Sequence, residues 1–374
     1  MTSETALRTL PASWYASRDH FARERDAIFR HGWSCVGVTD DVADPGSYMT
    51  ADVGGQPVLV VRDTDGTLRA FLNVCRHRGS PLVATDGEPA CGHARALGCP
   101  YHGWVFRLDG SLSRANGMDG VAGFDPAESA LFPVAVTTWA RFVFVNPSAG
   151  AAAEQPFDLG PLAAALDPYP LDSYVLHVRE QHRRAFNWKV GVENFSENFH
   201  TPFVHPELVT AGWDYPLVTD GPVCLAWDRP LDPRSDLERA LATARPGDRD
   251  WAGVVGAAGD SAEPYIAGVY ATVFPNLLIS IFPRYMSALH LTPVAPNLTL
   301  QRNYRFWTPD ADEEQRATEL AAAHVVAEQD LSMCEAVQRG YDAGIDTDGW
   351  LSPAWENGVA HVHGLVRGAL DGSR

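Results

Sequence analysis

Two short stretches of the chain each carry a cysteine and a histidine at close spacing. Cys75 and His77 form a C-x-H pair in CRHRG, and Cys99 and His102 form a C-x2-H pair in CPYHGW. Two thiolates and two imidazoles suit zinc, and they equally suit a two-iron two-sulfur cluster in which histidines hold one iron. The four side chains are therefore candidate ligands of a shared metal centre held by two loops.

Small residues beside these pairs favour the iron-sulfur cluster over zinc. Gly79, Pro100 and Gly103 allow tight turns and a close approach of the backbone. A sulfide-bearing cluster needs such an approach, because backbone N–H groups bond to its sulfurs. Zinc, in a protein that serves only as an interaction module, remains the alternative.

The spacer between the two loops holds a further C-x-H pair, Cys91 and His93. Only five residues separate this pair from Cys99, which is too few to form two opposing loops. Cys75 and His77 are therefore the preferred partners of the second loop.

A second group of candidate ligands lies in NWKVGVENFSENFHTPFVHPE. On a helix, Glu197 and His200 share a face because they are three residues apart. Pro202 is expected to end that helix at about Thr201 and to let His205 turn back toward His200. Two histidines and one carboxylate form the kind of iron site that leaves positions open for oxygen.

The carboxylate is expected far downstream, in AEQDLSMCEAVQRG. Helical spacing there marks an apolar stripe made of Val326, Asp330, Met333 and Val337. A carboxylate on such a stripe is costly unless it is paired or bound to a metal, which makes Asp330 the candidate ligand. Glu328 is the neighbouring alternative, but its position points it off the stripe.

The elements that must hold these residues fall into two parts. Residues 14–33 have apolar positions at near-helical spacing and predict an amphipathic helix. From about 35 to 146, short β-branched and aromatic runs separated by Gly, Asp and Pro are typical of a small antiparallel β domain. Residues 147–170, rich in Ala, Pro and Gly, form the expected boundary. Beyond it, a helical pattern at 313–340 and strand-like runs such as YATVFPNLLISIFP predict an α+β domain.

Composition and charge exclude several classes of protein. The 374 residues contain no apolar run of the ~18 residues needed to cross a bilayer. The start of the chain lacks the basic and apolar regions of an export signal, so the cytoplasm is the expected compartment. The six cysteines would stay reduced there, which favours metal binding over disulfides. A net charge of -18 argues against nucleic acid as a partner.

Two sets of motifs resemble one known family. The run CRHRG followed by CPYHGWVFRLDG resembles the Rieske motif, with a longer spacer than is usual, and NWKVGVENF, HTPFVH and DLSMCEAVQRG resemble the catalytic domain of Rieske non-haem iron oxygenase α subunits. The resemblance covers most of the chain and implies three parts. These are an N-terminal helical segment packing on the catalytic domain (1–34), a small antiparallel β Rieske [2Fe-2S] domain (35–150) and a larger catalytic domain with an antiparallel sheet flanked by helices (151–374).

The resemblance also implies a role for each candidate residue. The implied ligands of the [2Fe-2S] cluster are Cys75, His77, Cys99 and His102. The implied ligands of a mononuclear Fe(II) are His200, His205 and Asp330. Glu197 stands where the family has a carboxylate that links the iron site to a cluster histidine of the neighbouring subunit, and Asn194 would support the iron site. Such a link implies a head-to-tail ring, expected to be a homotrimer.

A terminal oxygenase component is the function that this resemblance implies. No glycine-rich flavin or nicotinamide fingerprint stands beside a helix start, so a separate NAD(P)H-dependent reductase, with or without a ferredoxin, is expected to supply electrons. The enzyme would use O2 to hydroxylate or demethylate a small organic substrate. Two alternatives remain: an aromatic-ring dihydroxylating dioxygenase, and a Rieske electron-transfer protein without oxygenase activity.

The substrate is less well defined by the sequence. Position 197 is glutamate where many members have aspartate. In this the chain resembles the branch that acts on quaternary ammonium compounds such as betaines and carnitine. Trp213, Tyr215 and Trp227 are candidates for an aromatic cage around such a cation. An aromatic ring is the other candidate substrate, and the residues that would enclose it are Trp227, Phe274, Ile279 and Phe282.

Overall fold

The computed structural model describes residues 7–85, 89–149, 156–208, 213–261, 267–345 and 348–372. Within these ranges the chain divides into two compact units. One unit holds the described residues up to Arg23 together with those from Asp158 onward, and the other holds Glu24–Phe157. The sequence places its boundaries at 34/35 and 150/151, and the second of these lies outside the described residues.

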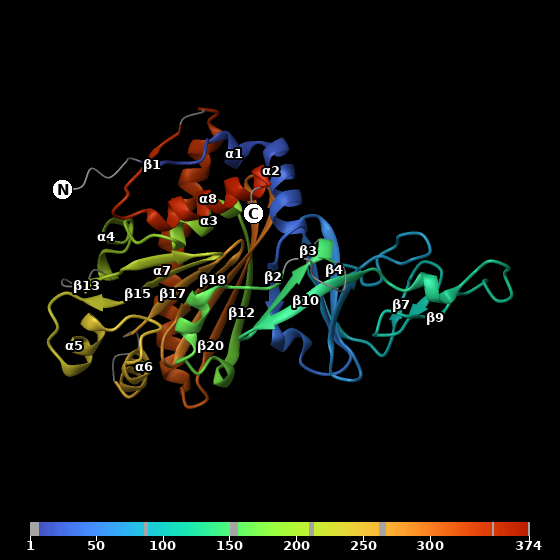
Figure 1. The fold of residues 1–374 in the computed structure, drawn as a ribbon, viewed down its shortest axis with the longest axis horizontal. Coiled ribbons are helices and arrows are strands. Elements are labelled where there is room, and N and C mark those ends of the chain that lie inside the picture. Colours follow the sequence, from blue (N-terminus) through green and yellow to red (C-terminus); the bar gives the residue numbers. More distant parts are fainter. Residues whose placement is uncertain are drawn as a thin grey trace. The chain divides into compact units, whose positions relative to one another are not determined.

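The Glu24–Phe157 unit is built on antiparallel sheets of short strands (Figure 1). Among its described residues, seven strands pair in the order β2-β11-β10-β5-β4-β3-β6: Ser34–Val38 (β2), Phe142–Asn146 (β11), Pro133–Trp139 (β10), Leu68–Leu72 (β5), Gln56–Arg62 (β4), Ser47–Val53 (β3) and Cys91–His93 (β6). A smaller sheet joins Leu97–Gly98 (β7), Val105–Phe106 (β8) and Leu112–Arg114 (β9). Central strands such as β4 are buried on both faces, which explains their continuous apolar runs.

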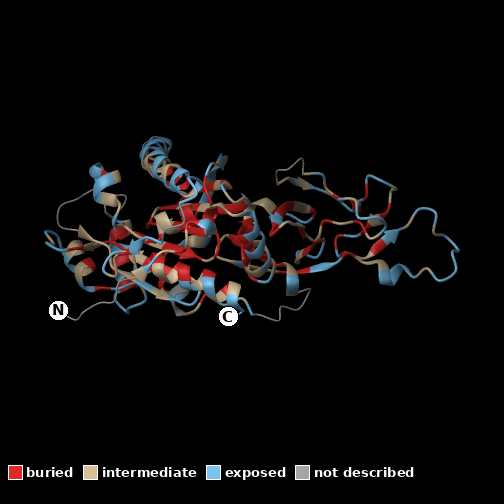
Figure 2. Cartoon of the chain, turned by 90° about the horizontal axis from the view of Figure 1, so that it is seen from above, coloured by how far each residue is buried: buried red, intermediate tan, exposed pale blue. Residues whose placement is uncertain are grey.

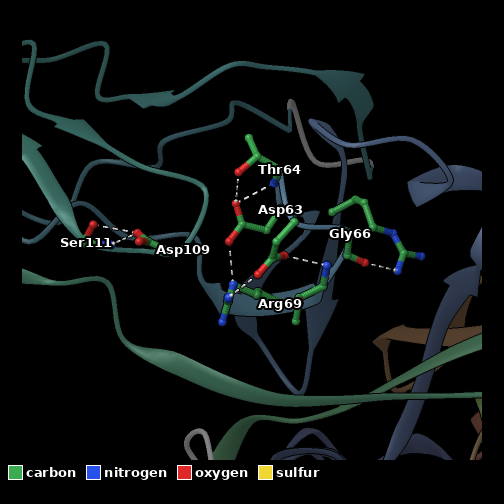
Figure 3. Close-up of polar contacts among 9 residues, drawn as sticks. Asp63, Thr64, Gly66, Arg69, Asp109 and Ser111 are labelled. Carbon is green, nitrogen blue, oxygen red and sulfur yellow. Dashed lines mark hydrogen bonds and ion pairs between the residues drawn. The ribbon is translucent and has the colours of Figure 1, made fainter.

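Polar side chains fix the turns of this unit (Figure 3). In the hairpin between β4 and β5, Arg69 Nε donates to Asp63 Oδ2 at 2.8 Å, and the backbone N–H of Thr64 donates to Asp63 Oδ1 at 2.6 Å. In the hairpin between β8 and β9, the backbone N–H of Ser111 donates to Asp109 Oδ1 at 2.8 Å. Such turns fix the register of the strands, and with it the points where the connecting loops begin.

The other unit contains a larger antiparallel sheet. Of the strands described there, seven pair in the order β12-β20-β19-β18-β17-β15-β14: Val175–Arg184 (β12), Leu298–Trp307 (β20), Tyr285–Ala295 (β19), Leu277–Ile281 (β18), Val269–Val273 (β17), Val223–Trp227 (β15) and Leu217–Asp220 (β14). Short strands also pair Leu7–Arg8 (β1) with Trp350–Leu351 (β21), and Trp213–Asp214 (β13) with Arg229–Pro230 (β16).

Helices accompany this sheet, and their bounds are Ser13–Ala16 (α1), Arg18–Glu24 (α2), Trp188–Phe195 (α3), Thr201–Val204 (α4), Asp236–Thr243 (α5), Trp251–Gly259 (α6), Glu313–Asp342 (α7) and Asn357–Asp371 (α8). Helix α3 contacts β19 and packs against α7 and α8 (Figure 1). Its start is fixed by Asn187, whose side chain accepts the backbone N–H of Lys189 at 3.0 Å. The Asp312 side chain caps α7 in the same way, accepting from Gln315 N at 2.8 Å. The predicted α+β fold is confirmed.

Buried residues run along the strands of both units, and exposed residues lie on the loops and outer helix surfaces (Figure 2). In the Glu24–Phe157 unit, one core cluster includes both loop cysteines together with Trp104, Phe106 and Leu131. The two loop cysteines are therefore anchored in this core.

In the described part of the chain, no helix is long and apolar enough to cross a membrane.

Two helix predictions are wrong in detail. Residues 14–33 do not form one helix, because Ser17 has extended backbone angles (φ -75°, ψ 130°) and separates α1 from α2, and a π-helical segment, Arg25–Arg30, follows. Pro202 does not end a helix. Helix α3 already ends at Phe195, and Pro202 lies in the first turn of α4, where a missing backbone N–H costs nothing.

Candidate metal centres

The two cysteine loops of the Glu24–Phe157 unit fold in the same way. Cys75 N donates to Ser80 O at 2.8 Å, and Gly79 N donates to Cys75 O at 3.0 Å. The second loop repeats this pattern, with Cys99 N donating to Trp104 O at 2.7 Å and Gly103 N donating to Cys99 O at 3.0 Å. These paired bonds hold each cysteine at the start of a tight turn.

The glycines make these turns possible. Gly79 and Gly103 have φ values of +77° and +70°, in the left-handed region that side chains with a Cβ rarely adopt. Each lies four residues after its cysteine. The prediction that Gly79 and Gly103 permit tight turns is therefore confirmed.

The polar atoms of these loops fit an iron-sulfur cluster. Burial alone would raise the pKa of the Cys99 thiol. Hydrogen bonds to its sulfur, among them those from the backbone N–H groups of Tyr101 and His102, outweigh burial, so the pKa is lowered. The rings of His77 and His102 lie 4.6 Å apart, and among the described residues the buried His102 Nδ1 has no hydrogen-bond partner. A buried ring nitrogen without a partner suits a metal ligand, because such an orphan is otherwise costly.

The spacer pair takes a different course. Cys91 and His93 lie on β6, which pairs with β3, and His93 Nε2 bonds to the carbonyl of Pro45 at 2.8 Å. Cys91 is exposed. This pair therefore lies on a strand and belongs to neither of the two cysteine loops.

In the other unit, three predicted side chains converge. One ligand atom from each of His200, His205 and Asp330 lies within 4.8 Å of the other two. Asp330 Oδ1 lies 2.9 Å from His205 Nε2 and 3.3 Å from His200 Nε2. Two imidazole nitrogens directed at one carboxylate oxygen form a donor set that a divalent iron would fit.

The outer nitrogen of each histidine also has a partner. His200 Nδ1 donates to Glu197 Oε1 at 2.6 Å, and His205 Nδ1 donates to Gln329 Oε1 at 2.7 Å. Such bonds fix the tautomer and the ring orientation, so that both Nε2 atoms face the metal position. Gln329 was missed by the sequence analysis, and its place directly before Asp330 was the available signal.

The charges of this site are strongly coupled. Burial alone would lower the pKa of His200, but hydrogen bonds to Asp330 and Glu197 raise it to about 9. Burial would raise the pKa of Asp330, but the two histidines lower it to about 2. At neutral pH the carboxylate is therefore ionised, as a metal ligand must be, whereas His200 must release its proton to bind a metal.

Replacing Gln329 by leucine should weaken metal binding in this unit. His205 would lose its Nδ1 acceptor, and loss of such a partner typically reduces metal affinity by about 10- to 100-fold. Iron content after competition with a chelator measures the effect. Glu328→Leu on the same helix is the matched control, because Glu328 is exposed. Equal iron retention by both variants would show that Gln329 has no such role.

Neighbouring residues contact this candidate metal site. Asn194 Nδ2, on α3, donates to Asp330 Oδ1 at 3.2 Å. The predicted stripe on α7 needs correction, because Met333 and Val337 are exposed by 43% and 44%. The buried face of α7 runs through Leu331 and Cys334 instead, and Asp330 lies at its edge, where it reaches the histidines.

A cavity of about 500 Å³ is lined on one side by His200, His205 and Asp330. Its floor is a row of residues paired directly across four neighbouring strands: Leu217, Ala226, Tyr270 and Ser280. Directly paired residues share one face of a sheet. Ala226, Tyr270 and Ser280 are each the half-exposed residue of an otherwise buried strand. The cavity over them explains this pattern.

The sequence identified only part of the cavity wall. Tyr215 lines it, but Trp213 and Trp227 of the expected cage do not in the described structure. The residues expected around an aromatic ring, Phe274, Ile279 and Phe282, do not line it either. Phe195, at the end of α3, was missed. So were Tyr270 and Trp355. Their positions depend on strand register and on a distant loop, which spacing alone does not reveal.

Comparison with known proteins supports both centres. Residues 32–125 match the Rieske [2Fe-2S] domain, and residues 171–372 match the ring hydroxylating alpha subunit (catalytic domain). The chain is 30% identical to the carnitine monooxygenase oxygenase subunit of Escherichia coli strain K12 (96% of this chain, 92% of that one) and 28% identical to the chloroplastic choline monooxygenase of Spinacia oleracea (95% and 76%). The crystal structure of the quaternary ammonium Rieske monooxygenase CntA with L-carnitine is similar as well, with a TM-score of 0.77, 27% identity and coverage of 97% and 96%.

Proposed function

The chain belongs to the Rieske oxygenases with a ring hydroxylating alpha subunit, and from this premise we propose that its substrate is a small quaternary ammonium compound. It is the terminal oxygenase component, which uses O2 and electrons from a reductase to hydroxylate or demethylate a small organic molecule. Relatives named as carnitine and choline monooxygenases support the proposed substrate class. They do not favour ring dihydroxylation or a purely electron-transferring role.

The cavity lining is the observation that carries the proposal. Its described residues include three carboxylates, Glu197, Asp214 and Asp330, and no lysine or arginine. Tyr215, Tyr270 and Trp355 supply aromatic rings. A quaternary ammonium group has no N–H to donate, so it is recognised by aromatic faces and by negative potential. An aromatic cavity whose described lining holds no lysine or arginine suits such a cation better than it suits an anionic substrate.

We propose a role for each group of site residues. Cys75, His77, Cys99 and His102 would hold the cluster, and His200, His205 and Asp330 would hold the iron. When bound, the cluster supplies electrons singly and the ferrous ion supplies the oxygen chemistry. Glu197 and Gln329 keep the histidine rings oriented, and Asn194 holds Asp330 Oδ1 in place.

A head-to-tail homotrimer in the cytoplasm is part of the proposal, as is an electron-donating reductase that acts directly or through a ferredoxin. In such a ring Glu197 would link the iron site to a cluster histidine of the next subunit. Exposed aromatic residues beside Glu197 support a contact there, because Phe199, Phe203 and Trp355 are exposed by 42%, 78% and 51%. Exposed apolar patches of this kind commonly mark protein interfaces.

The substrate class is tested by supplying the holoenzyme and a reductase with a panel of compounds. Choline, carnitine and glycine betaine should each be compared with benzoate and naphthalene, with oxygen uptake and organic product both measured. We expect product only from the cations. We also expect choline to exceed carnitine, because the described lining offers a substrate carboxylate only neutral donors. Product from an aromatic compound alone would overturn the proposal.

A further inference from the structure

A carboxyl group outside the metal site lies at the end of β15. Asp228 follows Trp227, and its backbone N–H donates to Gly268 O at 3.1 Å, just before β17. Because Asp228 lies two residues beyond Ala226, its side chain points to the same face of the sheet as the cavity floor. It is only 4% exposed, and it is not part of the described cavity lining.

Among the described residues, only neutral groups form hydrogen bonds with the Asp228 carboxyl. Gly268 N donates to Oδ2 at 2.8 Å, and the Tyr270 hydroxyl donates to Oδ1 at 3.3 Å. Arg229 follows directly, but it forms an ion pair with Asp214 instead. A Cβ at position 268 would lie closest to the Phe282 ring and within 2.7 Å of Asp228 Oδ2, so this glycine makes room for both the ring and the carboxyl. A carboxyl buried without a cationic partner is costly, which points to a ligand that benefits from it.

Two tyrosines connect Asp228 to the cavity. Tyr270 contacts the carboxyl and also lines the cavity. Tyr215 lines it too, with its ring 6.4 Å from that of Tyr270. Burial, and then the nearby charge of Asp228, raise the pKa of Tyr215 to about 12. The carboxyl thus lies close behind two aromatic rings of the cavity wall.

We propose that Asp228 is a specificity-determining residue whose charge, held behind Tyr215 and Tyr270, attracts the cationic end of the substrate to this wall. The inference rests on the quaternary ammonium substrate proposed above. It deepens that proposal by assigning the cation to a place in the cavity and to a charge that does not touch it. Water is largely excluded around this carboxyl, so its attraction acts over a longer range than a surface charge would.

The proposal implies a pH dependence. Burial raises the pKa of Asp228 to about 7, against the opposing hydrogen bonds from Gly268 and Tyr270. The other titratable or charged groups near it in the described structure are the phenols of Tyr169, Tyr215 and Tyr270, whose pKa values are all raised above 10, and Arg229, which is paired with Asp214. The carboxyl is neutral below its pKa and charged above it. Affinity for a cation should therefore increase from about pH 6 to about pH 8.

The test compares a cation with its neutral isostere. Dissociation constants of choline and of 3,3-dimethyl-1-butanol are measured on the holoenzyme, for the wild type, Asp228→Asn, and Asp232→Asn as an exposed control. We expect Asp228→Asn to weaken choline binding by about 10-fold, to leave the neutral isostere unchanged, and to abolish the pH dependence. Asp232→Asn should behave as the wild type does.

The outcomes separate this inference from the proposed function. Equal losses for both ligands would assign Asp228 a packing role and overturn the inference, as would a preference for choline that survives in Asp228→Asn. If the variant does not fold, the wild-type pH series decides, because a pH-independent preference for choline also overturns it. A wild type without any preference for choline over its isostere would instead overturn the proposed substrate class, and the inference with it.

Discussion

Replacing Asp330 by alanine should abolish substrate-dependent turnover and leave the cluster intact. Asp330 Oδ1 is the atom on which His200 Nε2, His205 Nε2 and Asn194 Nδ2 converge. Without it, two imidazoles and no charged ligand would remain for the iron. Loss of a direct ligand should exceed the roughly 10- to 100-fold effect of losing an outer partner. Product formation, iron per chain and the visible spectrum of the cluster are the measurements.

The matched control for this variant is Glu328→Ala. Glu328 lies on the same helix, two residues before Asp330, but it is exposed. It was also the alternative ligand in the sequence. Glu328→Ala should keep its iron and its turnover. If that variant loses iron while Asp330→Ala keeps it, the ligand assignment is reversed.

The sequence alone could identify the candidate ligands because their chemistry is local. C-x-H and C-x2-H place donors on one loop each, and the glycine four residues after each cysteine reveals the turn. His200 and His205 are likewise close in sequence. Asp330 was found through its helix, but the reason given was incomplete, since two members of the supposed apolar stripe, Met333 and Val337, are exposed.

The cavity could not be derived in the same way. Its floor is set by the register of four strands, and Tyr270 faces it only because β17 pairs Tyr270 with Ala226 and Ser280. A shift of one residue would turn each side chain to the other face. Trp355 reaches the lining from a loop more than a hundred residues after Tyr215. The sequence gives no sign of a role for Asp228, because its proposed role depends on burial behind Tyr215 and Tyr270.

Glu197 combines two functions that a single substitution can separate. Its Oε1 accepts from His200 Nδ1 at 2.6 Å, and its Oε2 accepts the backbone N–H of His200 at 3.1 Å. Its side chain is only 12% exposed. The hydrogen bonds need only an oxygen acceptor, whereas the proposed passage of electrons to the iron site needs the carboxylate. Glutamine keeps one oxygen, which can still accept from His200 Nδ1, but its NH2 group cannot accept the backbone N–H of His200, and the charge is removed.

Glu197→Gln should therefore slow turnover by roughly 10- to 100-fold while both metal sites stay filled. Reoxidation of the reduced cluster should slow to a similar extent. It is measured after rapid mixing of the reduced enzyme with O2 in the presence of choline. Glu197→Asp is the control, because it keeps the charge. Its reoxidation should be faster than that of the glutamine variant. Loss of iron from Glu197→Gln would instead make Glu197 a ligand, and a normal reoxidation rate would remove it from the electron route.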